Sequence, residues 1–168
     1  MSSIRETPAA TDTTGAAPPT TMSMHVVLGR QVVAADTAQE IGEIKAFVVD
    51  RSGRAITKVH VAGRKKKARL LPWSSLTVGP DVVMASSAAD STGVAADRDL
   101  EAVKGHIDIV GARILDTDGF EHGTVTDVDF DPTNGLIVLV HGNRLAIGAD
   151  RVRSLGRYAI VVDLSELE

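Results

Sequence analysis

The sequence predicts an all-β protein made of two small tandem β-barrels that follow a disordered N-terminal tail. Runs rich in Val, Ile and Leu are only a few residues long and alternate with turn-forming Gly, Pro and Asp, which is typical of small barrels and sandwiches. The two halves of the chain also resemble each other. A length of 168 residues suits one ordinary domain or two small ones, and 43% hydrophobic residues suffice for a core.

The composition excludes several kinds of site and segment. The chain contains no cysteine, which rules out disulfides, iron–sulfur clusters, cysteine-ligated zinc and thiol catalysis. Its longest apolar runs are far shorter than the roughly 20 residues of a membrane-spanning helix. The first residues lack the charged and then apolar layout of a secretory signal. We therefore expect a soluble, cytoplasmic protein.

The chain divides into four parts. Residues 1–24 are rich in Pro, Ala and Thr without apolar periodicity, and we expect them to be a disordered tail. Residues 25–86 are expected to form the first barrel, and residues 104–168 the second. Residues 87–103 between them are small and polar and are interpreted as a linker. One helical turn is expected at 99–104.

The first barrel contains short β-rich runs in a regular order. Each run is bounded by residues that favour turns, which predicts separate strands joined by tight connections. The runs are HVVLGRQVV (25–33), GEIKAFVVD (42–50), RAITKVHV (54–61) and LLPW (70–73). In VGPDVVMA (78–85), Gly79, Pro80 and Asp81 form another turn before a final short strand.

The second half of the chain repeats the first in outline. The shared positions are glycines and aspartates in turns and one histidine at a strand end, which two copies of a small β fold are expected to retain. The aligned pairs are Gly29 with Gly111, Asp36 with Asp118, Gly42 with Gly123, Asp50 with Asp131, Gly53 with Gly135, and His60 with His141.

This pattern of turns and strands resembles the PRC-barrel family. The family includes the cytoplasmic domain of the photosynthetic reaction centre H subunit and the C-terminal domain of the ribosome maturation factor. The resemblance implies a non-catalytic β-barrel that binds other proteins, present here as two tandem copies. The positions that carry it in the first copy are Gly29, Asp36, Gly42, Asp50, Gly53 and the segment LLPWSSL at 70–76.

A basic run with a nearby tryptophan provides the candidate partner-binding residues. Consecutive cations in a hairpin loop could bind an acidic protein, a phosphate backbone or an acidic membrane surface. The same run could also be an ordinary solvated loop that keeps an edge strand from pairing. Trp73 could close one end of the barrel, with its N–H on a carbonyl, or act as an exposed anchor. The candidates are Arg64, Lys65, Lys66, Lys67, Arg69 and Trp73.

Three alternating aspartates form a weaker candidate metal site. Asp127, Asp129 and Asp131 fall on one face of an expected strand, where their carboxylates could hold a hard cation. The spacing of a calcium loop is absent, so a solvated strand face is favoured over a metal site. We expect no cofactor, and no arrangement of Ser, His and Asp indicates catalysis.

The sequence thus favours a non-catalytic adaptor or regulatory module that binds a protein. The alternatives are an RNA- or ribosome-associated factor that binds through the basic loop, and a metal-dependent protein that uses the aspartate face. Residues 25–86 carry a net charge of +5 and residues 104–168 a net charge of −5, within a total of −4. This split is compatible with packing between the barrels, with self-association, or with two partners of opposite charge.

Overall fold

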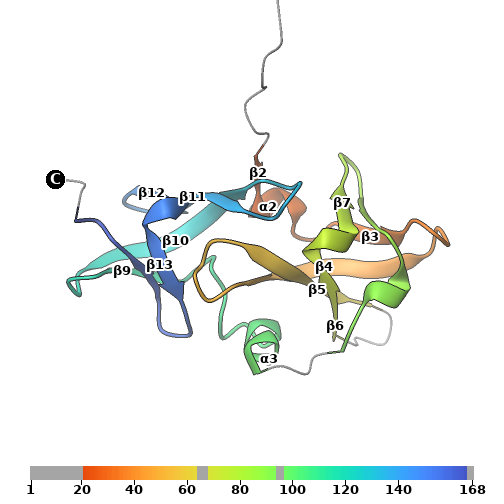
Figure 1. Ribbon diagram of the computed structural model, residues 1–168, viewed down its shortest axis with the longest axis horizontal. Helices are drawn as coiled ribbons and strands as arrows, with labels where there is room; N and C mark the ends of the chain where they lie inside the picture. The colour runs from red at the N-terminus through yellow and green to blue at the C-terminus, as the bar shows by residue number, and fades with distance from the viewer. Residues whose placement is uncertain (1–20, 64–67, 94–96, 166–168) are drawn as a thin grey trace, which may run out of the picture.

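The computed structural model describes residues 21–63, 68–93 and 97–165, and almost all of its regular structure is β (Figure 1). The strands form two sheets that lie side by side and are connected by short helices. The predicted all-β fold class is therefore confirmed. The calls on residues 1–20 and on the basic run at 64–67 lie outside the described residues.

The two sheets have the same strand order. The first follows β6-β5-β4-β3-β8-β7 and the second β12-β11-β10-β9-β14-β13, so each strand of the first unit has a counterpart six strands later. In each sheet only one of these neighbouring pairs is parallel, β3 with β8 and β9 with β14. The strands of the first unit are β3 (Gln31–Ala34), β4 (Glu40–Val49), β5 (Ile56–Ala62), β6 (Ala68–Pro72), β7 (Leu76–Val78) and β8 (Val83–Ala85). Those of the second are β9 (Arg113–Asp116), β10 (Glu121–Phe130), β11 (Ile137–Gly142), β12 (Ala146–Gly148), β13 (Val152–Leu155) and β14 (Ile160–Val162).

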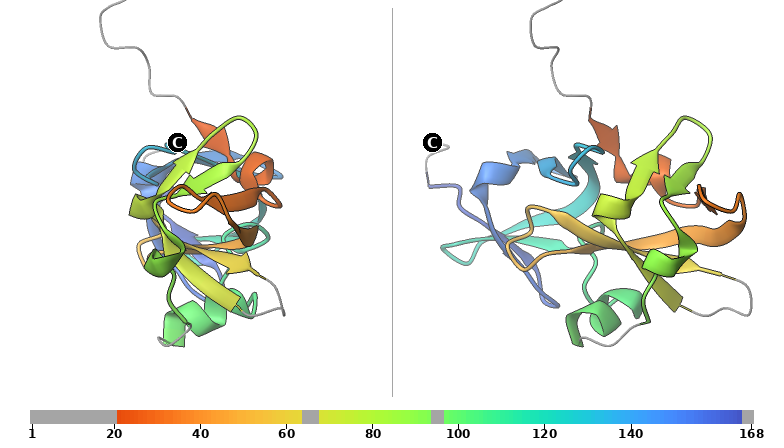
Figure 2. Two further views of the ribbon diagram at one scale, coloured as in Figure 1. Left: turned by 90° about the vertical axis from the view of Figure 1, so that its right-hand side faces the viewer. Right: turned by 45° about the vertical axis from the view of Figure 1, so that its right-hand side comes forward.

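Short helical turns occupy equivalent places in the two units. The 3₁₀ turn η2 (Trp73–Ser75) joins β6 to β7, and η4 (Ala149–Arg151) joins β12 to β13. The remaining elements are β2 (Met22–Ser23), α2 (Met24–Val27), η3 (Ala88–Asp90) and α3 (Asp97–Val103). Viewed as in Figures 1 and 2, β2 and α2 lie on one side of the molecule and α3 lies on the opposite side.

The two units share one hydrophobic core. Buried residues of both sheets belong to a single cluster, and three rings lie at its centre. Phe47 and Trp73 of the first unit contact Phe130 of the second, with ring centroids 5.8 Å and 5.4 Å away, and the Trp73 and Phe130 rings meet edge to face. Burial of these rings between the units provides hydrophobic stabilisation that neither sheet has alone.

A reciprocal pair of backbone hydrogen bonds joins the turns between the long strands. The Ile56 N–H donates to the Gly135 carbonyl, and the equivalent Ile137 N–H donates to the Arg54 carbonyl, each over 2.8 Å. The bridge residues are Ala55 and Leu136, which also occupy equivalent positions. The units therefore meet as two copies meet in a twofold-symmetric dimer, with the same surface on both sides.

The segment at residues 22–24 corrects the predicted extent of the disordered tail. β2 pairs with β10, so that Ser23 lies opposite Asp129 and Met22 lies opposite Phe130. β2 therefore belongs to the sheet of the second unit. Met24 is fully buried. The sequence did not indicate this strand because two residues are too few to show a period.

The predicted linker contains a helix that contacts both units. The Lys58 ammonium lies 2.7 Å from the buried carboxylate of Asp99 on α3. The guanidinium of Arg98 donates to the carbonyls of Asp50 in the first unit and Leu155 in the second, each over 3.0 Å. Ala102 packs on the outer face of the first sheet. This connection is therefore a structural strap as well as a linker.

Replacing Gly135 by Ala should destabilise the protein more than replacing Gly119 by Ala. Both glycines have positive φ, +77° and +91°, so each substitution carries the conformational cost of about 1–2 kcal/mol. A Cβ on Gly135 would also lie 2.8 Å from the Ile56 carbonyl oxygen and 2.9 Å from the Trp73 ring, whereas Gly119 has open space. We expect Gly135→Ala to cost about 1–3 kcal/mol more, measured by urea unfolding. Equal losses would contradict the close packing of the two units.

Candidate functional site

The structure places the predicted partner-binding residues in different environments. Arg64, Lys65, Lys66 and Lys67 lie outside the described residues. Arg69 is exposed on β6, and its Nε donates to the Ser91 hydroxyl over 2.8 Å.

Trp73 is part of the internal interface and is not an exposed anchor. Its side chain is buried at 3% exposure, and Nε1 donates to the Pro132 carbonyl of the second unit over 3.0 Å. The ring is therefore not available to an outside partner in this arrangement. The expectation of an N–H bonded to a carbonyl describes its environment correctly, but the carbonyl belongs to the other unit.

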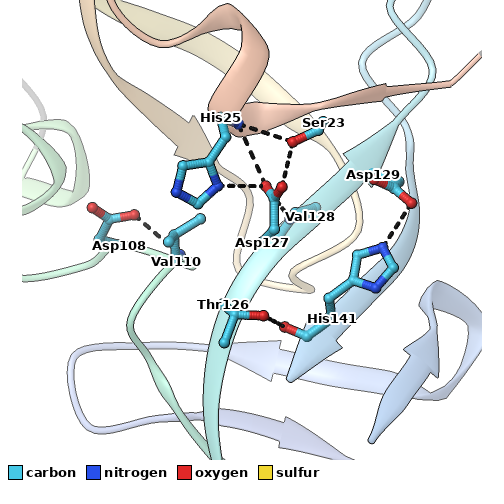
Figure 3. Close-up of polar contacts among 9 residues, drawn as sticks. All are labelled: Ser23, His25, Asp108, Val110, Thr126, Asp127, Val128, Asp129 and His141. Atoms are coloured by element: carbon cyan, nitrogen blue, oxygen red, sulfur yellow. Dashed lines mark hydrogen bonds and ion pairs between the residues drawn. The ribbon is translucent and has the colours of Figure 1, made fainter. Parts of the chain in front are cut away.

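The aspartates of β10 make separate hydrogen bonds (Figure 3). Asp127 accepts from the Ser23 hydroxyl and lies 3.1 Å from Nδ1 of His25, so it holds the N-terminal segment. Burial alone would raise the pKa of Asp127, but these hydrogen bonds and that of its neighbouring backbone hold the pKa below its ordinary value. Asp129 contacts Nε2 of His141 at 2.7 Å.

Asp131 closes the turn after β10. Its carboxylate accepts from the N–H and hydroxyl of Thr133, and both hydrogen bonds lower the pKa of Asp131. Within residues 21–63, 68–93 and 97–165, no group of three or more His, Asp or Glu side chains is arranged to hold a metal ion. The three carboxylates therefore have structural partners, which argues against the metal-site hypothesis.

Calcium, magnesium and a chelator should leave the melting temperature unchanged. A cation that binds only the folded state would raise the melting temperature by mass action. Differential scanning calorimetry with each addition measures this directly, and a rise with either ion that a chelator reverses would restore the aspartate site.

A polar pocket of about 430 Å³ lies in the second unit. It is formed by the connection from α3 to β9, by β9 and β10, and by the turn between β13 and β14. Two arginines, a histidine, two acidic residues and a tyrosine contribute its chemistry. These are Arg113, Arg157, His106, Asp108, Glu121 and Tyr158.

The cations of this pocket have partners within the protein. Arg157 and His106 lie 3.4 Å and 2.7 Å from the carboxylate of Glu101. Arg113 lies 3.8 Å from Glu121 and stacks on the Tyr158 ring, with 4.7 Å between guanidinium and ring centroid.

Asp108 differs from the other charged residues of the pocket. It lies in an exposed loop, and its carboxylate accepts a hydrogen bond from the Val110 N–H over 3.2 Å (Figure 3). No ion pair involves Asp108 among the residues that the structure describes. The protein around the carboxyl group removes enough water to raise the pKa of Asp108.

The two units differ at the position of Ala112, which lines this pocket. In the first unit Nη1 of Arg30 donates to the Gly79 carbonyl. The second unit has Ala112 at the position of Arg30 and Gly156 at that of Gly79. The alignment of Gly29 with Gly111 places Arg30 opposite Ala112, but only the structure reveals that the Arg30 side chain extends to the turn after β7.

Comparison with known proteins gives one family match, in the first unit. Residues 19–91 match the PRC-barrel domain family. The match covers the first sheet, and the same strand order recurs in the second sheet, which lies outside the matched residues. A comparison with curated proteins gave no match. The described part of the chain also holds no helix long and apolar enough to cross a bilayer.

Replacing Asp108 by Asn should stabilise the protein at neutral pH. Because the folded-state pKa is raised above the unfolded value, ionisation of Asp108 opposes folding once the pH rises through these pKa values. Asn keeps an acceptor for the Val110 N–H and carries no charge. We expect a higher free energy of unfolding at about pH 7 and a smaller difference near pH 4, measured by urea unfolding. Asp118→Asn, on the exposed turn before β10, is the matched control, and an equal effect there would contradict this explanation.

Proposed function

We propose that the protein is a non-catalytic binding module in which two PRC-type barrels form one scaffold for a protein partner. The PRC-barrel match over residues 19–91 supports a binding role for the first unit. The shared strand order supports a second PRC-type copy. We place this module in the cytoplasm, in keeping with a chain free of cysteine.

The rim of the pocket in the second unit is the observation that carries this proposal. Tyr158 is 70% exposed at the tip of the turn between β13 and β14, and Arg113 and Arg157 stand beside it. Tyr and Arg are enriched among residues that dominate binding energy at protein interfaces. Because β9 and β14 are fixed by the sheet, the rim is held in place before a partner arrives, which lowers the entropic cost of binding.

Nucleic-acid binding through Arg64, Lys65, Lys66 and Lys67 is the competing function. The basic run itself favours it, because phosphate contacts by clustered cations give strong, salt-dependent affinity. The exposed Arg69 near the end of this run would add to the same charge. A single aromatic residue near the run, buried at Trp73, offers no ring on which bases could stack.

Filling the pocket should abolish capture of the partner. We would compare the tagged full chain with Ala112→Arg, and with Ala89→Arg as a matched control on the exposed η3 turn. Proteins recovered from the source cells would be quantified by mass spectrometry. We expect one set to be recovered with the wild type and Ala89→Arg and reduced about tenfold or more with Ala112→Arg, as loss of an interface anchor predicts.

Two results would contradict this function. Equal recovery of every protein with all three chains would remove the pocket from binding. Enrichment of RNA that falls steeply with salt, and that Lys65/Lys66/Lys67→Glu abolishes, would favour the nucleic-acid alternative.

A further inference from the structure

The two units hold the same backbone framework around the pocket. Gly29 and Gly111 donate to the carbonyls of Ile44 and Val125, and both glycines have positive φ. The next residue in each unit, Arg30 or Ala112, accepts from the same strand partner. β3 and β9 therefore begin from equivalent backbone positions. The side chains of Arg30 and Ala112 project from equivalent places in the two units.

The opposite wall of the pocket is also conserved between the units. The Gly79 N–H donates to the Val82 carbonyl over 3.0 Å, and the Gly156 N–H donates to the Ala159 carbonyl over 3.1 Å. Gly79 thus follows β7 and Gly156 follows β13, each in the same tight turn. In the first unit the Gly79 carbonyl receives the Arg30 guanidinium, whereas the methyl group of Ala112 cannot make this hydrogen bond.

The second unit has gained an acidic group beside the vacated position. The residue four before Ala112 is Asp108, and its counterpart four before Arg30 is Val26. Asp108 lines the pocket and has no ion pair among the described residues, whereas Arg113 pairs with Glu121, and Arg157 and His106 share the carboxylate of Glu101. Among the described residues that line the pocket, Asp108 is therefore the carboxylate that has no ion pair.

We propose that this pocket binds an arginine side chain of a protein partner, in place of the side chain that the first unit supplies from Arg30. The guanidinium would donate to the Gly156 carbonyl, as Arg30 does to Gly79, and to the carboxylate of Asp108. Arginine fits better than lysine because its planar fork presents five donors that can reach two acceptors at once. This inference rests on the proposed function, since it names the group that a docked partner inserts.

The test uses the full chain and three small probes. N-acetyl-arginine methylamide supplies the guanidinium, the citrulline analogue has nearly the same shape without charge, and the lysine analogue has charge without the fork. Binding would be followed by ¹H–¹⁵N NMR at the amides of Ala112, Gly156 and Asp108. We expect saturable shifts with the arginine probe and affinities at least about tenfold weaker for the other two, as for a charge-assisted hydrogen bond.

Two variants and one control variant identify the groups that bind. Asp108→Asn should weaken binding of the arginine probe about tenfold or more, because it removes the charged acceptor, and Asp118→Asn should leave it unchanged. Ala112→Arg should abolish binding and raise the melting temperature, because it rebuilds the interaction of Arg30 within the second unit. Since Asp108→Asn is expected to fold at least as well as the wild type, lost binding in that variant would not reflect unfolding.

The outcomes separate this inference from the proposed function. No shift at Gly156 and Ala112, equal binding of the citrulline probe, or full binding by Ala112→Arg would overturn arginine recognition. If partner capture nonetheless depends on an open pocket, the binding module stands and the inserted group is different. If the arginine probe binds as expected and no partner is captured, recognition of the guanidinium stands and the docking function fails.

Discussion

The contact between the two units is the constraint on which the rest of the structure depends. Each sheet leaves one face of its long strand apolar, and neither unit covers this face by itself. The faces meet through Phe47, Trp73 and Phe130 and are kept in register by the backbone bridge between Ala55 and Leu136. Because the bridge is reciprocal, moving one turn would break hydrogen bonds on both sides. The two units are therefore one cooperative body.

Two segments from outside the two sheets reinforce this contact and make it asymmetric. β2 precedes the first unit in sequence but pairs with β10 of the second. α3 follows the first unit, and Arg98 joins carbonyls of both. Each segment occupies backbone groups near the end of a long strand, which would otherwise need water or a partner. The terminal and connecting segments thus serve as straps on opposite sides of the molecule.

The asymmetry between the units explains where a binding site could arise. In the first unit the Arg30 side chain reaches the turn after β7 and donates to the Gly79 carbonyl. This hydrogen bond contributes to the stability of the first unit. The second unit has Ala112 there and places Asp108 nearby, where partial desolvation makes its charge unfavourable in the folded state. A group that lowers stability in this way is common where a protein is shaped for a ligand. The first unit thus has the hydrogen bond of Arg30 to Gly79, and the second unit has Ala112 at the equivalent position.

The sequence by itself determined the fold class, most of the strands, and the outline of the repeat, because alternating β-branched runs and turn glycines such as Gly29 and Gly111 are local signals. The strand expected at 25–33 was wrong in its first part, because α2 includes residues 25–27 and β3 begins only at Gln31. It also predicted that Asp50 and Asp131 lie in equivalent turns of the two units. Tertiary structure alone decided that Trp73 is buried against the other unit, that Met22 and Ser23 join the second sheet, and that a pocket opens at Ala112. These features depend on contacts between residues far apart in the chain, such as Trp73 with Pro132 and Arg30 with Gly79. No local period or spacing encodes such contacts, since they follow from how two already formed sheets pack together.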